Sequence, residues 1–523
     1  MKFNILFNKE SLFIIFLSLF SVLANQYYGN RGVFPIDSFA HFDTGFRILL
    51  GEHPFKDYWI VSGPFIDYLQ AIFFYLFGTN WQSYVLHASF INMLLTVATY
   101  IVLRNFNLSN YYSFIYSLLF SVLAYPSSGT PFVDHHSAFF SLLGVYFLIL
   151  AIKNEKIFYW VLLPLFFGFA FLSKQVPSFY IIISVIIILS IFSVSQRKFY
   201  WIKYSFYSFL SFILFLLIFA NIQKINLSSF LEQYIFYTST IGGQRFENAD
   251  FTFRGVVGHF KFIYLSMIPL FYFNFKNIFF EKKYFKQKNF YYFLSLLLLT
   301  FSLIFHQLLT RNQTFIFFLI PILMAFSHIS LNSYKPNLSR LVYITIILIC
   351  LLITVKYHLR FNEDRKFHEL NYVNFELSSF GKTIDKKFIG LRWITPEFKN
   401  NPKEEIVLIN ETKSYLNNDH RNKMVMTNYS FFSVILGQKL FSPSRWYISD
   451  GTAYPLKGNK YFVSYKNLLI NTIEKNNIEV VYTIFPEENS DIYNYIGKNC
   501  FQEKRINKIL KSYELKHCDE ING

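Results

Sequence analysis

Long apolar blocks, separated by short polar connections, follow one another along the chain from residue 11 to residue 357. A helix of about 20 apolar residues is long enough to cross the hydrocarbon core of a bilayer. The stretch 64–78 is shorter and predicts a half-span or a helix at the membrane surface. The pattern predicts about eleven spans, at residues 11–28, 81–103, 111–125, 135–152, 157–173, 177–194, 202–221, 258–275, 289–306, 314–330 and 339–357.

The last third of the chain has a different pattern. Runs rich in β-branched residues, at 404–410, 423–429 and 478–485, alternate with stretches of helical period. Such alternation is typical of a small α/β domain. The sequence therefore predicts an α-helical polytopic membrane domain at residues 1–357, with a long first loop at 29–80, and a soluble C-terminal α/β domain at 358–523.

Composition strengthens this interpretation and excludes two classes of protein. The chain is 53% hydrophobic and 15% charged, whereas roughly a quarter of the residues in an ordinary soluble domain are charged, so a purely soluble enzyme is excluded. The formal charge of +17 raises the question of nucleic acid. Its cations stand in short clusters between apolar blocks, which is the signature of membrane topology and not of a nucleic-acid surface.

The basic clusters also predict an orientation. If the N-terminus is cytoplasmic, the loops at 104–110, 153–156, 196–198, 276–288 and 333–340 share its side, and all of them are net positive. An odd number of spans then places the loops 29–80 and 222–257 and the C-terminal domain outside. Cys500 and Cys518 could pair there if the compartment is oxidising, and the sequence leaves that pairing open.

The first outer loop is rich in acids for this protein. A carboxylate at an apolar boundary is partly desolvated, which raises its basicity and suits it to remove a proton from a hydroxyl group. Asp37 is the first candidate, at the start of an amphipathic helix predicted from Ser38, with His41 one turn further on as a candidate substrate ligand. Asp37 could equally be an N-cap. Asp43 is a second candidate catalytic acid, although a solvated helix face is the simpler interpretation.

A second polar site opens the fourth predicted span. Asp134, His135 and His136 stand at its outer end, where charged groups are costly unless they serve a site or reach water. Asp134 and His135 are therefore candidate substrate ligands. Asp134 could instead oppose the positive end of the helix. Two adjacent histidines cannot share one helical face, so the pattern identifies no metal site and leaves a divalent metal open.

Cations on the outer face form a third group. Lys174 lies in a turn of a few residues between two spans, Arg311 lies just before another span, and Arg245 lies in the loop 222–257. Such cations can hold a lipid phosphate, whereas Arg254 and Lys261 are better explained by snorkelling to headgroups. The chain has no glycine-rich phosphate loop, CxxC pair or nucleophile elbow. Together these groups suggest a reaction between a lipid-borne phosphate ester and a hydroxyl acceptor.

Five motifs, in this order and on this side of the membrane, resemble those of the GT-C membrane glycosyltransferases. The bacterial branch similar to protein O-mannosyltransferases and lipid A aminoarabinose transferases is the nearest in pattern. The resemblance covers about 350 residues. The motifs are IDSFAHFDTGFRILLGEHPFKDYW at 36–59, SGPF at 62–65, DHH at 134–136, LSKQ at 172–175 and RNQTFIFFLIP at 311–321.

The resemblance implies a multi-pass protein of the bacterial inner membrane. It implies a polyprenyl-phosphate donor carrying one sugar, and inverting transfer to a hydroxyl group of a glycan, lipid or protein. By position, Asp37 matches the family's catalytic acid. Lys174 and Arg311 match cations near the lipid phosphate, and Asp134 with His135 match the polar site of the second outer loop.

One departure bears on the mechanism. Many members of the family carry two adjacent acids at the first site, whereas this chain has Asp37 followed by Ser38. A second carboxylate would have to come from elsewhere, such as Asp43.

Two other functions compete with this one. A transporter or flippase of lipid-linked saccharides would place polar residues in the middle of broken helices, whereas this chain keeps its charges at the outer ends. A lipid-linked saccharide polymerase or ligase usually depends on large late outer loops and not on an acidic first loop.

Overall fold

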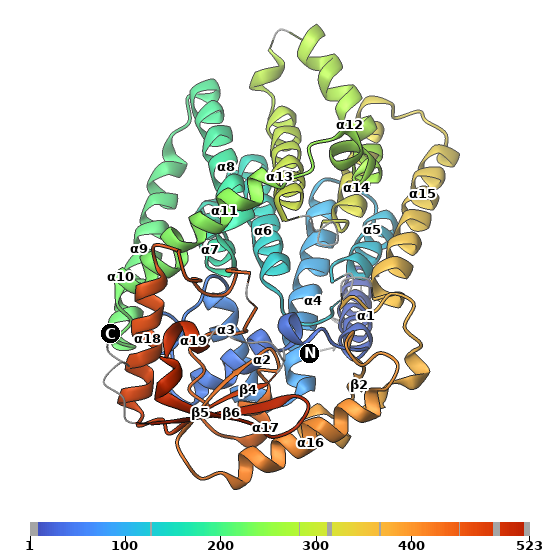
Figure 1. Ribbon diagram of the computed structural model, residues 1–523. Coiled ribbons are helices and arrows are strands. Elements are labelled where there is room, and N and C mark those ends of the chain that lie inside the picture. Colours follow the sequence, from blue (N-terminus) through green and yellow to red (C-terminus); the bar gives the residue numbers. More distant parts are fainter. Residues whose placement is uncertain are drawn as a thin grey trace, which may run out of the picture. The chain divides into compact units, whose positions relative to one another are not determined.

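The computed structural model describes residues 9–125, 128–281, 283–310, 316–365, 368–448, 450–484 and 492–516 (Figure 1). The chain divides into two compact units, each described by itself. The first contains Met1–Gly29, Ala88–Leu216 and Arg245–Phe367, and the second contains Asn30–His87, Leu217–Gln244 and His368–Gly523. The first loop is thus grouped with the C-terminal part of the chain.

The first unit is helical, and each of the eleven predicted spans overlaps a helix, although the span predicted at 314–330 begins outside the described residues. In the described part of the chain, seven helices are long and apolar enough to cross a membrane, namely α1, α4, α6, α8, α9, α13 and α15 extended to Glu363. The helices lying wholly or mostly in this unit are α1 Lys9–Gly29, α4 Trp81–Asn105, α5 Asn110–Leu123, α6 Val133–Asn154, α7 Ile157–Ser173, α8 Gln175–Gln196, α9 Tyr200–Ile222, α12 Lys261–Phe280, α13 Lys288–Thr310, α14 Leu319–Tyr334 and α15 Arg340–His358.

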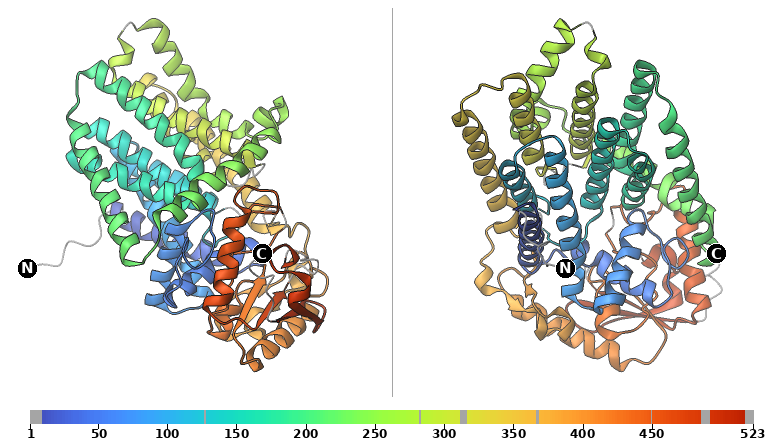
Figure 2. Two further views of the ribbon diagram at one scale, coloured as in Figure 1. Left: turned by 60° about the vertical axis from the view of Figure 1, so that its left-hand side comes forward. Right: turned by 180° about the vertical axis from the view of Figure 1, so that it is seen from behind.

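Helix α6 is the centre of a group that includes α7, α8 and α13, which run beside it in both figures (Figure 1, Figure 2). The most apolar stretch of α6 is 94% buried inside the protein, whereas the corresponding stretch of α9 is 11% buried. A helix that is apolar on every side must be covered by other helices or by lipid. Gly144 lets α7 approach closely, because a Cβ there would lie 2.7 Å from the ring of Phe167.

The second unit is an α/β assembly, which confirms the predicted C-terminal class. In its four-stranded sheet the order is β3-β4-β6-β5, with β3 parallel to β4 and the other neighbours antiparallel. Its helices are α2 Pro35–Leu49, α3 Pro64–Phe77, α10 Leu227–Phe230, most of α11 Thr238–Glu247, α16 Pro402–Asn418, α17 Phe432–Leu436, α18 Phe462–Lys475 and α19 Ile492–Tyr495. Its strands are β1 Ser379–Phe380, β2 Arg392–Trp393, β3 Lys423–Thr427, β4 Val480–Ile484, β5 Phe501–Arg505 and β6 Leu510–Leu515.

The expected strand at 404–410 is wrong, because this segment lies in helix α16. Pro402 occupies the first turn, where its missing N–H costs nothing. The side chain of Asn401 accepts a hydrogen bond from the backbone N–H of Glu404, as an N-cap residue does, and its amide group donates one to the Glu404 carboxylate. These start signals outweigh the strand preference of the Ile-Val-Leu-Ile run. The strands expected near 423–429 and 478–485 are present as β3 and β4.

Helices α2 and α3 of the first loop pack within the second unit. The rings of Phe39 and Phe42 on α2 lie in one buried aromatic cluster with Trp393 and Phe431. Helix α3 has 14 residues, which extend about 21 Å, short of the roughly 30 Å of a hydrocarbon core. Burial against the C-terminal strands and helices therefore holds the acidic loop in place.

The cysteines differ in state. Cys500 is disulfide-bonded, whereas Cys350 is a buried free thiol. Cys518, the third cysteine of the sequence, lies outside the described residues.

Candidate functional site

Asp37 lies in the first turn of α2, which begins at Pro35 and not at Ser38 as expected. The N-cap position belongs to Phe34, whose backbone N–H donates to the Ser38 hydroxyl at 3.0 Å. The N-cap interpretation of Asp37 is therefore wrong, although its carboxylate still opposes the positive end of the helix. Asp37 is half-buried and stands one helical turn before His41, so both side chains leave the same face of α2.

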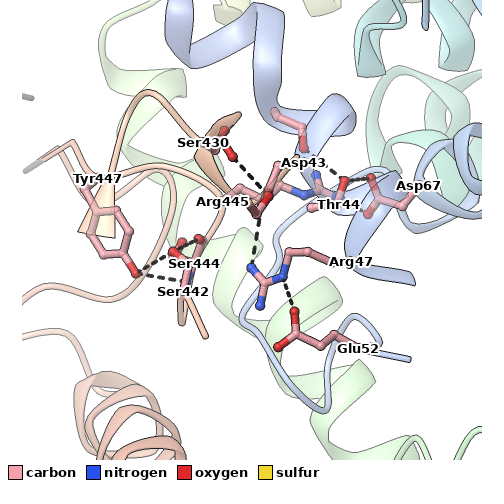
Figure 3. Close-up of polar contacts among 12 residues, drawn as sticks. Asp43, Thr44, Arg47, Glu52, Asp67, Ser430, Ser442, Ser444, Arg445 and Tyr447 are labelled. Atoms are coloured by element: carbon pink, nitrogen blue, oxygen red, sulfur yellow. Dashed lines mark hydrogen bonds and ion pairs between the residues drawn. The ribbon is translucent and has the colours of Figure 1, made fainter. Parts of the chain in front are cut away.

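A buried network joins α2, α3 and the loop before residue 447 (Figure 3). Oδ1 of Asp67 accepts hydrogen bonds from Nδ1 of His41 at 2.7 Å and from Oγ1 of Thr44 at 2.5 Å. Its other oxygen accepts from Arg445, whose guanidinium also donates to the Ser62 carbonyl at 2.5 Å. Burial lowers the pKa of His41, against the effect of Asp67. The hydrogen bond to Asp67 holds the ring in a fixed orientation.

Asp43 is buried, which contradicts its interpretation as part of a solvated helix face. Its side chain is 4% exposed, it accepts a hydrogen bond from the Ser433 hydroxyl, and Oδ2 lies 3.8 Å from Nη1 of Arg47. The Nε atom of Arg47 donates to Glu52 at 2.9 Å. Burial raises the pKa of Asp43 from its ordinary 3.8 to about 6, although the charge of Arg47 opposes the rise.

This raised pKa predicts a pH-dependent stability. Folding favours the protonated form of Asp43, so its contribution is fully present below about pH 4 and is lost as the pH rises through about 6. The Asp43→Asn variant lacks this ionisation. The thermal midpoint of this variant, relative to that of the unmodified chain, should rise by several degrees between pH 4 and pH 7. The reason is that a pKa difference of two units corresponds to about 3 kcal/mol. Tryptophan fluorescence at a series of pH values measures the difference, and a difference independent of pH would contradict the expectation.

A second cluster lies in the first unit around Asp134, in the first turn of α6. Both of its carboxylate oxygens accept from Nζ of Lys174 at 2.8 Å, and Oδ1 also contacts Nε2 of His306 at 2.6 Å. Lys174 is the single extended residue between α7 and α8. The hydroxyls of Ser137 and Ser178 donate to its backbone carbonyl at 3.2 and 2.7 Å and fix the turn.

The other predicted residues of this cluster have different surroundings. Arg245 lies within electrostatic range of His306. The ring of His135 is fully buried, 4.7 Å from the ring of Tyr125 and beside Phe139. Arg311 lies outside the described residues. Among the residues that are described, no group of three or more His, Cys, Asp and Glu side chains could hold a metal ion.

Three residues of these networks were not singled out from the sequence. Asp67 was one acid among five in the first loop, and Arg445 stands in the C-terminal part without a local motif. Nothing in the sequence pairs them, because 378 positions separate them. His306 could have been found, because it is a histidine at the end of an apolar span that the basic loops predict to face outside, as His135 is.

Part of the chain matches a known protein family. Residues 53–222 match the family model described as dolichyl-phosphate-mannose-protein mannosyltransferase. This match confirms the resemblance inferred from the motifs, and its range includes Asp67, Asp134 and Lys174. Asp37 precedes it.

One solved structure with a similar fold is that of ArnT from Cupriavidus metallidurans, a crystal structure with undecaprenyl phosphate bound. The two chains are 10% identical, the alignment covers 96% of this chain and 97% of that one, and the TM-score is 0.48. No curated protein sequence matches the chain.

Proposed function

We propose that the protein is an inverting glycosyltransferase that moves a single sugar from a polyprenyl-phosphate donor to a hydroxyl acceptor at the outer face of the membrane. The observation that carries the proposal is the match of residues 53–222 to a family that uses a sugar on a long-chain isoprenoid phosphate. The matched range contains the Asp134–Lys174 pair, in which a carboxylate holds a cation at the first turn of an apolar helix.

The proposed location is the bacterial inner membrane, with a cytoplasmic N-terminus and an extracytoplasmic C-terminal domain. The distribution of basic loops supports this orientation. The disulfide bond of Cys500 supports it independently, because disulfides persist in oxidising compartments. The soluble domain is then separated from cytoplasmic nucleotides, in agreement with a lipid-borne donor.

In the proposed reaction Asp37 removes the proton of the acceptor hydroxyl, whose oxygen attacks the anomeric carbon. A bond forms between that oxygen and the anomeric carbon, the bond to the phosphate oxygen breaks, and polyprenyl phosphate leaves with the electron pair. Lys174 and Arg311, with Arg245, stabilise the charge that grows on the phosphate. Asp134, His135 and His41 bind and orient substrate groups, and Asp43 supplies a second carboxylate.

The pairing of Lys174 fixes the position of its charge. Asp134 holds the ammonium group with both carboxylate oxygens. Because Asp134 also contacts His306, its negative charge is shared between two partners, and a preorganised cation of this kind needs no rearrangement during the reaction.

A transfer assay tests the proposed function. Purified protein in lipid nanodiscs is given a radiolabelled polyprenyl phosphosugar and a mixture of envelope glycans and lipids. Release of polyprenyl phosphate together with a labelled acceptor supports a transferase. Movement of the intact donor across a vesicle membrane without cleavage would instead show a flippase, and growth of a multi-sugar chain would show a polymerase or ligase.

In the same assay, Lys174→Met should lower kcat by about 10²- to 10³-fold, the usual effect of removing one preorganised group. Lys198→Met is the matched control. Its ammonium contacts both oxygens of Glu155 at 2.8 Å, in a pair of the same geometry at the other ends of α6 and α8. The control should retain activity within a few-fold. Equal losses in the two variants would mean that Lys174 serves only to hold helices together.

A further inference from the structure

Helix α3 turns its polar side inward and an apolar side outward. Its one charged residue, Asp67, is fully buried against Arg445. Gln70 is also buried, with Oε1 2.9 Å from Nδ1 of His87. A helix at the surface of a soluble domain has the opposite arrangement, with its apolar stripe toward the core. The residues of the outward side, half-buried in the first half of the helix and exposed in the second, are Phe65, Tyr68, Leu69, Ile72, Tyr75 and Leu76.

This outward side is one continuous surface. Its residues recur at every third or fourth position, so they form a single stripe along the helix. Tyr75 is 81% exposed and Leu76 is 62% exposed. Because contiguous apolar surface of this kind marks contact with a membrane or with another protein, the stripe is built for a partner other than water.

Both halves of α3 are tied to helices that are long and apolar enough to cross a membrane, α4 and α9. Only residues 78–80 separate α3 from α4, and Oγ of Ser83 in the first turn of α4 donates to the Phe77 carbonyl at 2.9 Å. In the first half of α3, the ring of Tyr68 lies 4.9 Å from that of Phe219, in the last turn of α9. The stripe is therefore continuous with the ends of two candidate spans.

The composition of the stripe fits a bilayer better than a protein partner. Tyr68 and Tyr75 carry amphipathic rings, which are enriched at the level of the lipid headgroups, and the aliphatic members match acyl chains. The stripe has no charged residue, whereas the rim of a specific protein interface is polar. With 14 residues, or about 21 Å, the helix is too short to cross the hydrocarbon core.

We infer that the outward side of α3 docks into one leaflet of the bilayer, with the helix lying in the plane of the membrane. A half-span would place one end of the helix in hydrocarbon, whereas α3 is buried on its inward side from Ile66 to Phe74. Helix α3 also packs against α2 (Figure 1), and Asp67 holds His41 of that helix. Docking therefore sets the height of α2 relative to the headgroups. Because no donor or acceptor takes part, the docking is independent of the proposed function.

Spin labels on introduced cysteines test the docking. The full chain carries Cys350→Ser, which removes the buried free thiol, together with Ile72→Cys or Tyr75→Cys. It is placed at one copy per nanodisc of phosphatidylethanolamine and phosphatidylglycerol. Oxygen concentrates in the hydrocarbon, whereas a water-soluble nickel chelate stays outside it. The ratio of oxygen to nickel collisions should be several-fold higher for these labels than for a label that faces water.

Val407→Cys on α16 supplies that water-facing label. Val407 is apolar and 56% exposed, as Ile72 is 53% exposed, but its neighbours on the helix, Glu404 and Glu411, are charged and exposed. Thermal midpoints show whether each labelled chain is folded. Collision ratios at Ile72 and Tyr75 equal to that at Val407 would overturn the inference, and so would exclusion of both reagents, which would mean that protein covers the stripe.

A second pair of labels tests the orientation of the helix. Leu69 and Leu76 lie on the same stripe about two turns apart, so Leu69→Cys and Leu76→Cys should give similar collision ratios if α3 lies in the plane of the membrane. A ratio that rises several-fold from one position to the other would show a half-span and would overturn the in-plane arrangement.

Discussion

Replacing Asp37 with asparagine should lower the rate of sugar transfer by about 10²- to 10⁴-fold, the range that a positioned general base contributes. The amide has nearly the shape of the carboxylate but cannot take up the proton of the acceptor hydroxyl. The fold should survive, because Asp37 is half-buried in the first turn of α2. Loss of a negative charge at that position costs only about 0.3–1 kcal/mol. Single-turnover measurement with a saturating acceptor isolates the chemical step from binding.

Asp57→Asn is the control for this prediction, since it makes the same change in the same loop. Asp57 accepts a hydrogen bond from the backbone N–H of His53 at 2.8 Å and lies 3.9 Å from Lys56, and the amide oxygen can retain the first contact. Its activity should stay within a few-fold of normal. Near-normal turnover in Asp37→Asn would remove that residue from the mechanism and direct attention to Asp43 or His41.

The membrane helices could be predicted because their signal is local. An apolar block long enough to cross a bilayer has few alternatives to a helix, and each predicted block overlaps a helix in the residues that the structure describes. The segment 404–410 shows where local reasoning fails. Its β-branched residues favour a strand, yet the decision is made at its start, by Asn401 and Pro402.

The contacts within the site are harder to predict, because they join residues that are far apart in the sequence. Asp43 was expected to be solvated, and Ser433, which donates to it, stands 390 positions away. Its burial and raised pKa therefore depend on how the C-terminal segment returns to α2. Asp134 and His306 are likewise brought together by the fold, because 172 positions separate them in the sequence. Residue type and membrane side identified the candidates, whereas their partners required the structure.

Asp67→Asn should produce the largest loss of stability, about 3–5 kcal/mol, the usual effect of breaking a fully buried ion pair. Asp67 is 0% exposed and Arg445 is 2% exposed, so water cannot replace the missing charge. The amide oxygen can still accept from His41 and Thr44, but its NH2 group faces the guanidinium. In a unit of this size the thermal midpoint should fall by roughly 10 °C, as measured by tryptophan fluorescence.

Two further variants separate charge from packing in this network. Thr44→Val removes one neutral donor to Asp67 and leaves both charges in place, so it should cost about 1 kcal/mol. Asp67→Asn combined with Arg445→Met removes both charges and should recover part of the loss, because no unpaired buried charge is left. A double variant as unstable as the sum of the single ones would mean that the two side chains contribute independently.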